Sequence, residues 1–385
     1  RDAPLWAIVR HGKNYALLDR EAGAGLMRRL CRTLPGEKRF GQAAPRLHSA
    51  LRRRRAAAYL RRRSTYFGSM AGLMVLLSAR FGGGFEYLNV GHCNLDDLFL
   101  RQIKSAGAAP IRIKLHDMIP LDFPDLVRDD TPALFQSRAR SAMVYADQII
   151  CNSAHTANRV GHHAAGLGTR PSCLVAHLGV SVPDRVKQGA IREPYFVCLG
   201  TIEPRKNHAF LFEVWQLLAD QGGPVPKLYV IGARGWRNDG VFRLLDSSPL
   251  MGRHITECAA LPDKEMFALM SGAAALLCPS HEEGFGLPAL EARALGVPVI
   301  CSPIPAFREL LRGDATMLKT DDPQRWADAV LARASAHSAG TPSPANARRP
   351  ARVPTWEQHF AKVFGTESVA SGQAAQGAFT SVRTV

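Results

Sequence analysis

Two carboxylates and a glycine-rich turn stand close together in Pro279–Ile300, which reads PSHEEGFGLPALEARALGVPVI. Glu283 directly precedes Gly284-Phe285-Gly286, and Glu291 follows after seven intervening residues. Glycines let backbone amides approach a ligand closely, and a helix start presents unpaired N–H groups to an anion. Carboxylates repel phosphate, but they accept hydrogen bonds from hydroxyl groups. The segment therefore predicts a site for a phosphorylated ligand that also carries sugar or ribose hydroxyls.

A second loop supplies positive charge. Arg205 and Lys206 lie in GTIEPRKN, Gly200–Asn207, before an amphipathic helix that Asn207 can cap. Two cations beside a helix N-terminus suit a diphosphate. Taken alone, such a pair is equally typical of a solvated basic loop, and a lone Glu is most often an ordinary surface residue. Two strand-to-helix loops with matching chemistry favour a ligand site over both alternatives.

Strands and helices alternate through the C-terminal half. The expected strands are Tyr195–Gly200, Lys227–Ile231, His254–Cys258, Ala273–Cys278, Val297–Cys301 and Ala315–Leu318. The expected helices begin at Asn207 and near Asp263, and cover Pro288–Leu295, the run PAFRELL and Pro323–Ser335. This alternation implies right-handed crossovers and a parallel sheet. Ligands bind outside the carboxyl ends of such strands, which is where both chemical loops lie.

The N-terminal half shows a similar but less regular pattern. Its expected strands are Trp6–Val9, Tyr87–Val90, Ile111–Leu115, Gln148–Cys151 and Cys173–Ala176. Because 385 residues exceed the usual size of one core, we expect two α/β domains, 1–190 and 191–340, with the seam near Lys187–Pro194. A helix at 350–365 and a disordered tail at 366–385 complete the predicted organisation.

Composition narrows the class of protein only in part. The net charge of +16 suggests an anionic partner, which includes nucleic acid, phosphorylated substrates and acidic membranes. The eight cysteines form no CxxC pair and no cluster with zinc spacing, so we expect buried, reduced thiols in a cytoplasmic protein. No signal peptide is visible, and the apolar run Phe67–Ser78 is shorter than the ~20 residues that span a bilayer.

Pro279–Ile300 and GTIEPRKN together resemble the retaining glycosyltransferases of family four, which have the GT-B fold. The carboxylate pair matches the family's E-x7-E motif, and HDMIP, His116–Pro120, resembles the loop with its N-domain histidine. The similarity runs from about residue 87 to 365. It includes YLNVGHCNLDD (87–97), CNSAHT (151–156), HLGV (177–180), GARGW (232–236) and TWEQHFAKVF (355–364), the last of which resembles a helix crossing back to the N-domain. YLNVGHCNLDD and HDMIPLDFP resemble bacterial members that build surface polysaccharides.

This resemblance implies the fold, the donor site and the reaction. The fold would be α/β, GT-B, with two Rossmann-like domains whose parallel sheets face each other across a cleft. Glu283 would lie by the donor sugar's hydroxyls and Glu291 would hold the ribose. The donor site would also include Gly200, Gly284, Phe285, Gly286 and Leu287, with backbone N–H groups of the glycine turn around the sugar and phosphates.

The remaining implied roles concern catalysis. Arg205 and Lys206 would neutralise the diphosphate as it leaves, and His116 would contact the sugar from across the cleft. Glu283 would complete the catalytic set. The family is described with front-face transfer, in which the leaving phosphate takes the acceptor proton, so neither a metal ion nor another cofactor is expected. A core or capping histidine is the alternative interpretation of His116.

One loop that is usual in the family is not found in this sequence. Members usually carry a glycine-containing loop after the first N-domain strand, and no such loop precedes Trp6. EAGAGL, Glu21–Leu26, lies further along the chain than the expected strand Trp6–Val9 and is only a weak candidate. Since the chain begins at Arg1 rather than Met, we expect that N-terminal sequence is missing.

The predicted activity is transfer of a sugar from GDP- or UDP-sugar to a glycan or lipid-linked acceptor, with retention of configuration. Three alternatives stay open: a GT-B sugar-nucleotide epimerase, a basic nucleic-acid-binding protein without a matched binding module, and a non-catalytic scaffold. We expect no nucleic-acid partner. The arginine-rich segment Arg46–Arg63, RLHSALRRRRAAAYLRRR, predicts a basic amphipathic helix. It would attach the protein peripherally to an anionic membrane at its cytoplasmic face, unless it is simply a solvated helix.

Overall fold

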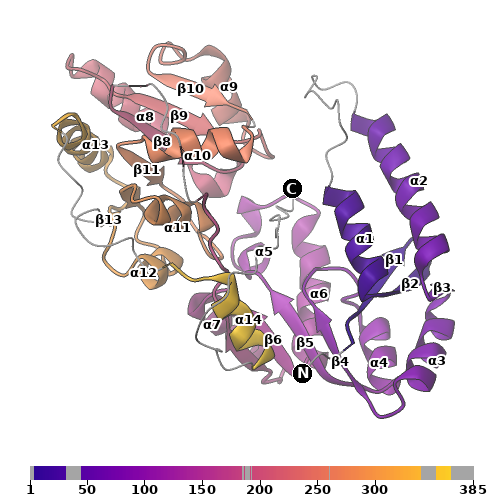
Figure 1. Ribbon diagram of the computed structural model, residues 1–385. Helices are drawn as coiled ribbons and strands as arrows, with labels where there is room; N and C mark the ends of the chain where they lie inside the picture. Colours follow the sequence, from indigo (N-terminus) through magenta and orange to yellow (C-terminus); the bar gives the residue numbers. More distant parts are fainter. Residues whose placement is uncertain are drawn as a thin grey trace, which may run out of the picture. The chain divides into compact units, whose positions relative to one another are not determined.

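The computed structural model in Figure 1 describes residues 4–31, 45–183, 186, 191, 193–259, 261–339 and 353–365. Two compact units divide the described chain, the first ending at Arg112 and the second covering Ile113–Ser368. The predicted domain boundaries at 190 and 340 stay predictions. The side chains of residues 30, 31 and 45–53, and the predicted tail at 366–385, lie outside the described part.

The second unit contains a six-stranded parallel sheet in the order β10-β9-β8-β11-β12-β13. Renumbered along the chain, this is the order 3-2-1-4-5-6 of a Rossmann fold. The predicted strands are therefore confirmed in type and number. They are β8 (Tyr195–Leu199), β9 (Lys227–Ile231), β10 (Ile255–Cys258), β11 (Ala275–Cys278), β12 (Val299–Cys301) and β13 (Thr316–Met317).

Helices cover both faces of this sheet, as continuous apolar strands require. One face carries α8 (His208–Asp220), α9 (Asp239–Ser247) and α13 (Pro323–Ser338). The opposite face carries α10 (Asp263–Ser271), α11 (Leu287–Ala294) and α12 (Pro305–Leu311). The five predicted helices of this half are confirmed, and α9 is a helix that the sequence interpretation did not include.

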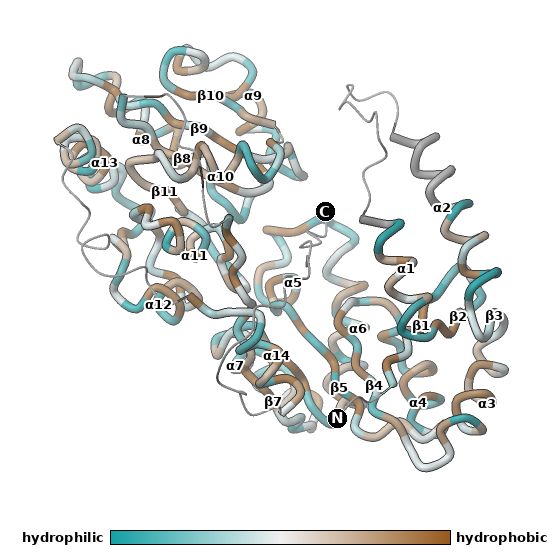
Figure 2. Tube along the Cα trace, in the orientation of Figure 1, coloured by the Kyte–Doolittle hydropathy of each residue, from teal (hydrophilic) through white to brown (hydrophobic). Residues whose placement is uncertain are grey.

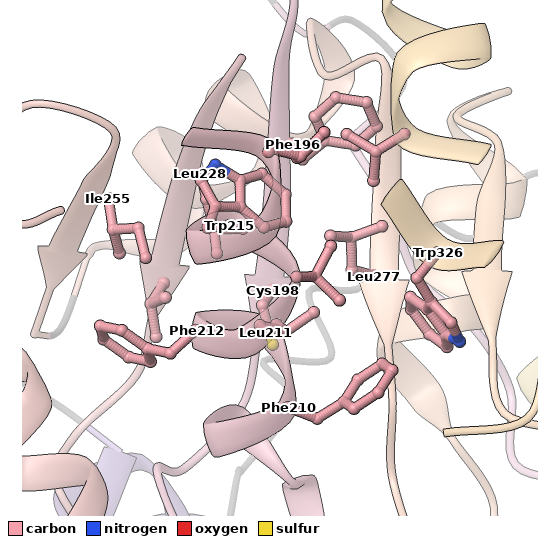
Figure 3. Close-up of a cluster of buried hydrophobic side chains, with 14 of the residues drawn as sticks. Phe196, Cys198, Phe210, Leu211, Phe212, Trp215, Leu228, Ile255, Leu277 and Trp326 are labelled. Atoms are coloured by element: carbon pink, nitrogen blue, oxygen red, sulfur yellow. The ribbon is translucent and has the colours of Figure 1, made fainter. Parts of the chain in front are cut away.

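Two buried tryptophans fix the helices of the first face (Figure 3). Trp215 of α8 meets Phe196 edge-on at 6.0 Å between ring centroids, and its indole N–H donates to Pro226 O at 2.8 Å. Trp326 of α13 meets Phe210 edge-on at 5.4 Å. Because each indole N–H has a partner, these large side chains fill the core without burying an unpaired donor. The packing holds β8 and the loop that follows it in place.

A second sheet has four strands in the order β4-β5-β6-β7. Its members are β4 (Phe85–Asn89), β5 (Ala108–Leu115), β6 (Gln148–Cys151) and β7 (Ser172–Val175), and β6 pairs with β7 in parallel. The connecting helices in the second unit are α5 (Ile119–Asp122), η1 (Pro124–Leu126), α6 (Thr131–Tyr145) and α7 (Ala154–Gly166). The four strands predicted here are confirmed. The α/β fold class is likewise confirmed.

The first unit begins with an antiparallel sheet that the sequence interpretation missed. Its strands are β1 (Trp6–His11), β2 (Asn14–Asp19) and β3 (Tyr66–Gly68), and β2 lies between the other two. Gly12 has φ +62° in the turn that joins β1 to β2. A two-residue turn produces an antiparallel pair, so Trp6–Val9 does not belong to the parallel sheet as predicted.

The weak loop candidate Glu21–Leu26 is wrong, because it lies inside helix α1 (Arg20–Cys31). Asp19 accepts a hydrogen bond from Ala22 N at 2.8 Å, which starts the helix. Ala22 and Leu26 are buried against Ala16 and Leu18 of β2. The small residues of EAGAGL therefore serve helix packing and do not form a ligand loop.

Helix α2 (Pro45–Arg63) confirms that the arginine-rich segment is helical. Leu60 is buried in the core of the first unit, and the Tyr59 hydroxyl donates to Ala22 O at 2.9 Å. Tyr59 and Leu60, which we expected on the apolar side of the amphipathic helix, therefore stabilise the unit itself. Arg54, Arg55 and the arginines at 61–63 are exposed. In Figure 2 the described part of α2 is partly teal, whereas helix α3 (Met70–Arg80) shows more brown.

Phe67–Ser78, the apolar run beside α2, forms part of β3 and most of α3, and its Leu73 and Leu77 are buried. Helix α4 (Asp97–Ser105) completes the described helices of this unit. Among the described residues, none of the helices combines the length and apolar character needed to cross a bilayer.

The C-terminal helix α14 (Trp356–Phe364) packs on the segment after β7. Val180 N donates to Pro354 O at 2.9 Å, and a side chain at Gly179 would collide with Trp356. His359 is buried, with Nδ1 3.0 Å from His177 O. These contacts agree with a helix that returns to the N-terminal half. Residues 350–352 of the predicted helix lie outside the described part.

The thiol prediction is correct for part of the chain. The described cysteines are free, and Cys151, Cys198, Cys278 and Cys301 are buried. Cys93 and Cys173 are exposed instead, because Cys93 lies in the loop after β4 and Cys173 near the start of β7.

His208, the first residue of α8, makes the fold sensitive to acid. Burial lowers its pKa to about 4, with a further lowering by Lys206, and neither ring nitrogen has a hydrogen-bond partner among the described residues. The unfolded chain takes up a proton below pH ~6.5 whereas the folded chain does not until pH ~4. Folding stability should therefore fall by about 2 kcal/mol between pH 7 and pH 5 from this residue alone.

We expect His208→Leu to remove that part of the acid sensitivity, measured as the difference in urea unfolding free energy between pH 7 and pH 5. The matched control is His162→Leu, because His162 is exposed on α7. The prediction is wrong if both variants lose as much stability on acidification as the parent.

Candidate functional site

The two chemical loops occupy the place where a Rossmann sheet binds its ligand. Strands β8 and β11 are neighbours, and the chain leaves β8 toward β9 but enters β11 from the far edge. The crevice at this reversal of strand order is the usual ligand position. Gly200–Asn207 follows β8 and Pro279–Gly286 follows β11, so both predicted loops meet there.

The cations and a carboxylate of these loops form one buried ion-pair cluster. Lys206 Nζ lies 2.6 Å from Glu283 Oε1, and the Arg205 guanidinium hydrogen-bonds the other oxygen of Glu283. Arg205 also pairs with Glu203 at 2.6 Å, and the Ser280 hydroxyl donates to Glu283 Oε1 at 2.8 Å. The structure therefore brings together three residues that the sequence singled out separately.

The backbone conformation of the two loops positions Arg205 and Lys206 in the cluster. Pro204–Lys206 forms the short helix η2, and His281 N donates to Arg205 O at 2.9 Å, which ties the two loops together. Gly200 has φ +146°, and a Cβ there would approach the Lys206 side chain at 3.1 Å. Asn207 occupies the N-cap position of α8 as predicted, but its backbone is left-handed and its side chain makes no capping bond.

The cluster strongly favours the charged forms of its members. Burial alone would raise the pKa of Glu283, but Lys206 and Arg205 outweigh it and lower that pKa to about 2. Burial opposes the charge of Arg205, yet Glu283 and Glu203 hold its pKa above the usual range. An anion that enters this site must therefore compete with carboxylates for both cations.

Neighbouring atoms lie so close to two glycines of the turn that a side chain at either position would collide with them. A Cβ on Gly284 would lie 2.7 Å from Asp117 Cβ and 3.0 Å from His116 O. Gly286 has φ +93° and a Cβ there would meet the Phe307 ring at 2.7 Å. Phe285 between them is buried, and its ring lies 5.9 Å from that of His177. The turn therefore needs small residues for packing as well as for access to a ligand.

Helix α11 begins immediately after the turn and carries the second carboxylate. Leu287 is its first residue and Gly286, three residues after Glu283, is its N-cap. Glu291 is buried on this helix, with 7% of its surface exposed. Two buried carboxylates thus occur at and just beyond the helix start, where the sequence placed them.

The structure places His116 next to the glycine turn. It directly follows β5, and its backbone oxygen is close to Gly284 and accepts a hydrogen bond from Asn152 Nδ2 at 3.1 Å. The same amide nitrogen lies 3.4 Å from His116 Nδ1. Sequence elements from both halves of the chain therefore meet at the glycine turn.

Sequence reasoning passed over three acidic residues of the same site. Glu203 pairs with Arg205, and Glu282 accepts a hydrogen bond from Glu283 N at 2.9 Å. Asp117 packs on Gly284, and burial raises the pKa of both Asp117 and Glu282. Each lies inside a quoted motif, GTIEPRKN, PSHEEGFG or HDMIP. Their position in the sequence, within two residues of Arg205, Glu283 and His116, could have indicated that they belong to the site.

Among the residues that the structure describes, no group of three or more His, Cys, Asp or Glu side chains is arranged to hold a metal ion.

Comparison with known proteins supports this geometry. The family model described as glycosyl transferases group 1 matches residues 183–334, which include both loops and the cluster. This region is a group 1 glycosyltransferase domain. The domain thus contains Arg205, Lys206, Glu283 and Glu291, whereas His116 lies before it.

Relatives of the group 1 glycosyltransferase domain include enzymes of bacterial O-antigens. The chain is 27% identical over 246 residues to the Escherichia coli "Serotype-specific mannosyltransferase WbdA", covering 59% of this chain and 30% of that protein. It is 37% identical over 124 residues to the E. coli "O-antigen chain mannosyltransferase B", covering 32% of each chain. The chain thus spans about a third of the length of these curated relatives.

Solved structures with the GT-B fold extend the likeness beyond the group 1 domain. Anabaena Alr3699/HepE, solved in complex with UDP and glucose, superposes with a TM-score of 0.57 and 16% identity. The match covers 78% of this chain and 83% of that one. At this identity the comparison shows the fold, and it supports the GT-B prediction for the sheets on both sides of residue 190.

The fit at Gly284 gives a direct test of the site's geometry. We expect Gly284→Ala to lower stability by about 1–3 kcal/mol, because its methyl group must displace Asp117 or the His116 backbone. The measurement is urea unfolding of the purified variant.

Gly161→Ala is the matched control, because nothing lies within 4 Å of a Cβ there and the position is exposed inside helix α7. Alanine should stabilise that helix slightly. Equal stability of Gly284→Ala and the parent would contradict the close approach of the two segments.

Proposed function

We propose that the protein transfers a sugar from a nucleoside-diphosphate sugar to an acceptor hydroxyl with retained configuration. The observation that carries this proposal is the buried cluster of Arg205, Lys206 and Glu283 at the strand-order reversal of a group 1 glycosyltransferase domain. Cations for a diphosphate and carboxylates for hydroxyl groups occur there side by side. A sugar nucleotide carries both kinds of group.

Charge stabilisation of the leaving group would be the main catalytic contribution. Breaking the bond between the sugar and the diphosphate builds negative charge on the phosphate oxygen. Arg205 and Lys206 are already fixed side by side through their ion pairs with Glu283 and need little rearrangement as that charge develops. N–H groups at the start of α11 would add to this stabilisation. The diphosphate would replace Glu283 as the partner of the cations, which frees the carboxylate for sugar hydroxyls.

The other residues would orient the donor. Glu291 would accept hydrogen bonds from the ribose hydroxyls, while backbone N–H groups of Gly284, Phe285 and Gly286 would contact sugar and phosphate. Gly200 and Leu287 would line the same site. His116 would contact the sugar from the opposite segment. Its position against Gly284 supports this role.

The acceptor proton needs a destination, and the leaving phosphate oxygen is the nearest base created by the reaction. In this front-face scheme the acceptor oxygen bonds to the anomeric carbon, the bond to the phosphate oxygen breaks, and the acceptor proton passes to that oxygen. Configuration is retained because attack and departure share one face. The scheme assigns charge neutralisation to Arg205 and Lys206 and uses no metal ion.

We further propose that the product belongs to a bacterial surface polysaccharide or its lipid-linked precursor. Similarity to O-antigen mannosyltransferases supports this choice and favours a GDP-mannose-type donor. The UDP bound to the structural neighbour supports a UDP-sugar instead. Thermal unfolding with UDP, GDP and their sugars distinguishes the two. A ligand at a hundred times its Kd adds roughly 2.7 kcal/mol.

Variants of the two glutamates test the function itself. We expect Glu291→Ala to weaken nucleotide binding, and Glu283→Ala to reduce turnover more than nucleotide affinity. Each change removes charged hydrogen bonds that are worth about 1.5–3 kcal/mol. Binding is followed by calorimetry, and turnover by release of nucleoside diphosphate with EDTA present, since the proposed mechanism needs no metal.

Glu213→Ala is the control, because Glu213 is exposed on α8. Parental rates in both site variants would refute the assignment. A product that is an isomerised sugar nucleotide would favour the epimerase alternative. Absence of any nucleotide binding would favour a non-catalytic scaffold.

We also propose that exposed arginines of α2 hold the protein at an anionic membrane surface. Because Leu60 is buried, the attraction would be electrostatic and not an insertion of an apolar stripe. Each cation near such a surface contributes about 1 kcal/mol. A lipid-linked acceptor would make this location useful.

Vesicle co-sedimentation at low salt tests this attachment. We expect the parent to bind anionic vesicles but not neutral ones, and Arg52–Arg55 changed to Gln to bind several-fold less. The matched control changes four arginines of the second unit that are exposed, Arg243, Arg253, Arg312 and Arg325, and so alters net charge equally. Equal binding by the two fourfold variants would reduce the effect to net charge and contradict the proposal.

A further inference from the structure

Four consecutive residues at the start of α7 contact three residues that are far away in the sequence, His116, Gly284 and Glu309. Asn152 donates to His116 O at 3.1 Å, and the Ser153 hydroxyl donates to Gly284 O at 3.1 Å. Ala154 N donates to a carboxylate oxygen of Glu309 at 2.8 Å. His155 N donates to the other oxygen of Glu309 at 3.2 Å. Residues 152–155 therefore connect the segment after β5 with the loop after β11 and with helix α12.

Glu309 is the charged partner of two backbone N–H groups in this short segment, those of Ala154 and His155. It lies on α12 and reaches the first turn of α7, where unpaired N–H groups and the positive end of the helix dipole favour a carboxylate. His177 Nε2 lies 2.8 Å from Glu309 Oε1. Burial alone would raise the pKa of Glu309, but His177 and the two backbone hydrogen bonds lower it.

The side chain of His155 makes a second contact between the start of α7 and the loop after β11. His155 Nε2 lies 3.6 Å from Glu282 Oε1, and that oxygen accepts the hydrogen bond from Glu283 N. A continuous series of contacts thus runs from Glu309 through residues 154 and 155 to the backbone of Glu283. Ser153 adds a second link at Gly284.

We propose that Glu309 is a positioning residue, which fixes the start of α7 and through it holds the glycine turn against the His116 segment. This inference rests on the proposed function for its effect on turnover. Arg205 and Lys206 are held by ion pairs with Glu203 and Glu283 and by the hydrogen bond from His281 N to Arg205 O, and none of these contacts involves Glu309. Loss of Glu309 should therefore displace the sugar end of the site and leave the diphosphate end in place.

Kinetics of Glu309→Ala provide the first test. We expect kcat to fall by about tenfold to a hundredfold, as expected for lost charge-assisted hydrogen bonds, with nucleoside-diphosphate Kd within a few-fold of the parent. Glu309→Gln keeps an acceptor oxygen for the backbone N–H groups, so its kcat should lie between those of Glu309→Ala and the parent. Glu213→Ala on the exposed face of α8 is the control.

Hydrogen exchange of the full chain gives a readout that does not need activity. We expect Glu309→Ala to increase exchange in peptides covering 152–160 and 281–290, and to leave peptides of β8 and α8 unchanged. Faster exchange throughout the second unit together with lost nucleotide binding would assign Glu309 to general stability and overturn the inference. Unchanged exchange at 281–290 would also overturn it.

The two proposals fail separately. If the parent releases no nucleoside diphosphate from any sugar nucleotide, the proposed function is wrong, and the exchange pattern alone decides whether Glu309 holds the turn. If the parent is active and Glu309→Ala keeps its kcat, the function stands and the positioning role is wrong.

Discussion

The pairing of Glu283 with Arg205 and Lys206 is the interaction on which the rest of the site depends. It joins the loop after β8 to the loop after β11 across the reversal of strand order. Buried charges are tolerated only when they are paired and hydrogen-bonded, so each loop fixes the other. Breaking such a pair by removing one partner costs about 3–5 kcal/mol, because the remaining charge stays buried. The tryptophan-centred core beneath β8 supplies the rigid base that this arrangement requires.

Close packing adds a second constraint at the same point. Gly284 lies so near Asp117 and His116 that no larger residue fits without movement. Electrostatics thus join the two loops of the Rossmann sheet, while sterics and residues 152–155 join those loops to the segment after β5. A change in the ion pairs or in the packing contacts would therefore alter the position of the same glycine turn.

The sequence predicted the parts of the fold that follow a regular pattern. Alternating apolar strands and amphipathic helices predicted all six strands of the sheet β10-β9-β8-β11-β12-β13, and the glycine turn predicted where the ligand loops meet. The hairpin Trp6–Asp19 was missed because a strand shows no direction in its composition, and Glu21–Leu26 was misjudged because small residues suit helix packing as well as loops. Glu309 was missed because its contact with α7 joins residues more than 150 positions apart. Periodicity contains no information about such contacts.

Internal neutralisation of the cations has a consequence for ligand selectivity. A simple anion such as sulfate could bind Arg205 and Lys206 only by separating them from the carboxylates with which they are paired. Sulfate has no hydroxyl group that could donate a hydrogen bond to a displaced carboxylate. A sugar nucleotide brings hydroxyl groups that re-engage the displaced Glu283. The same ion pairs that join the two loops would thus discriminate against the abundant small phosphates of a cell. Discrimination of this kind comes from the cost of leaving a buried charge without a partner.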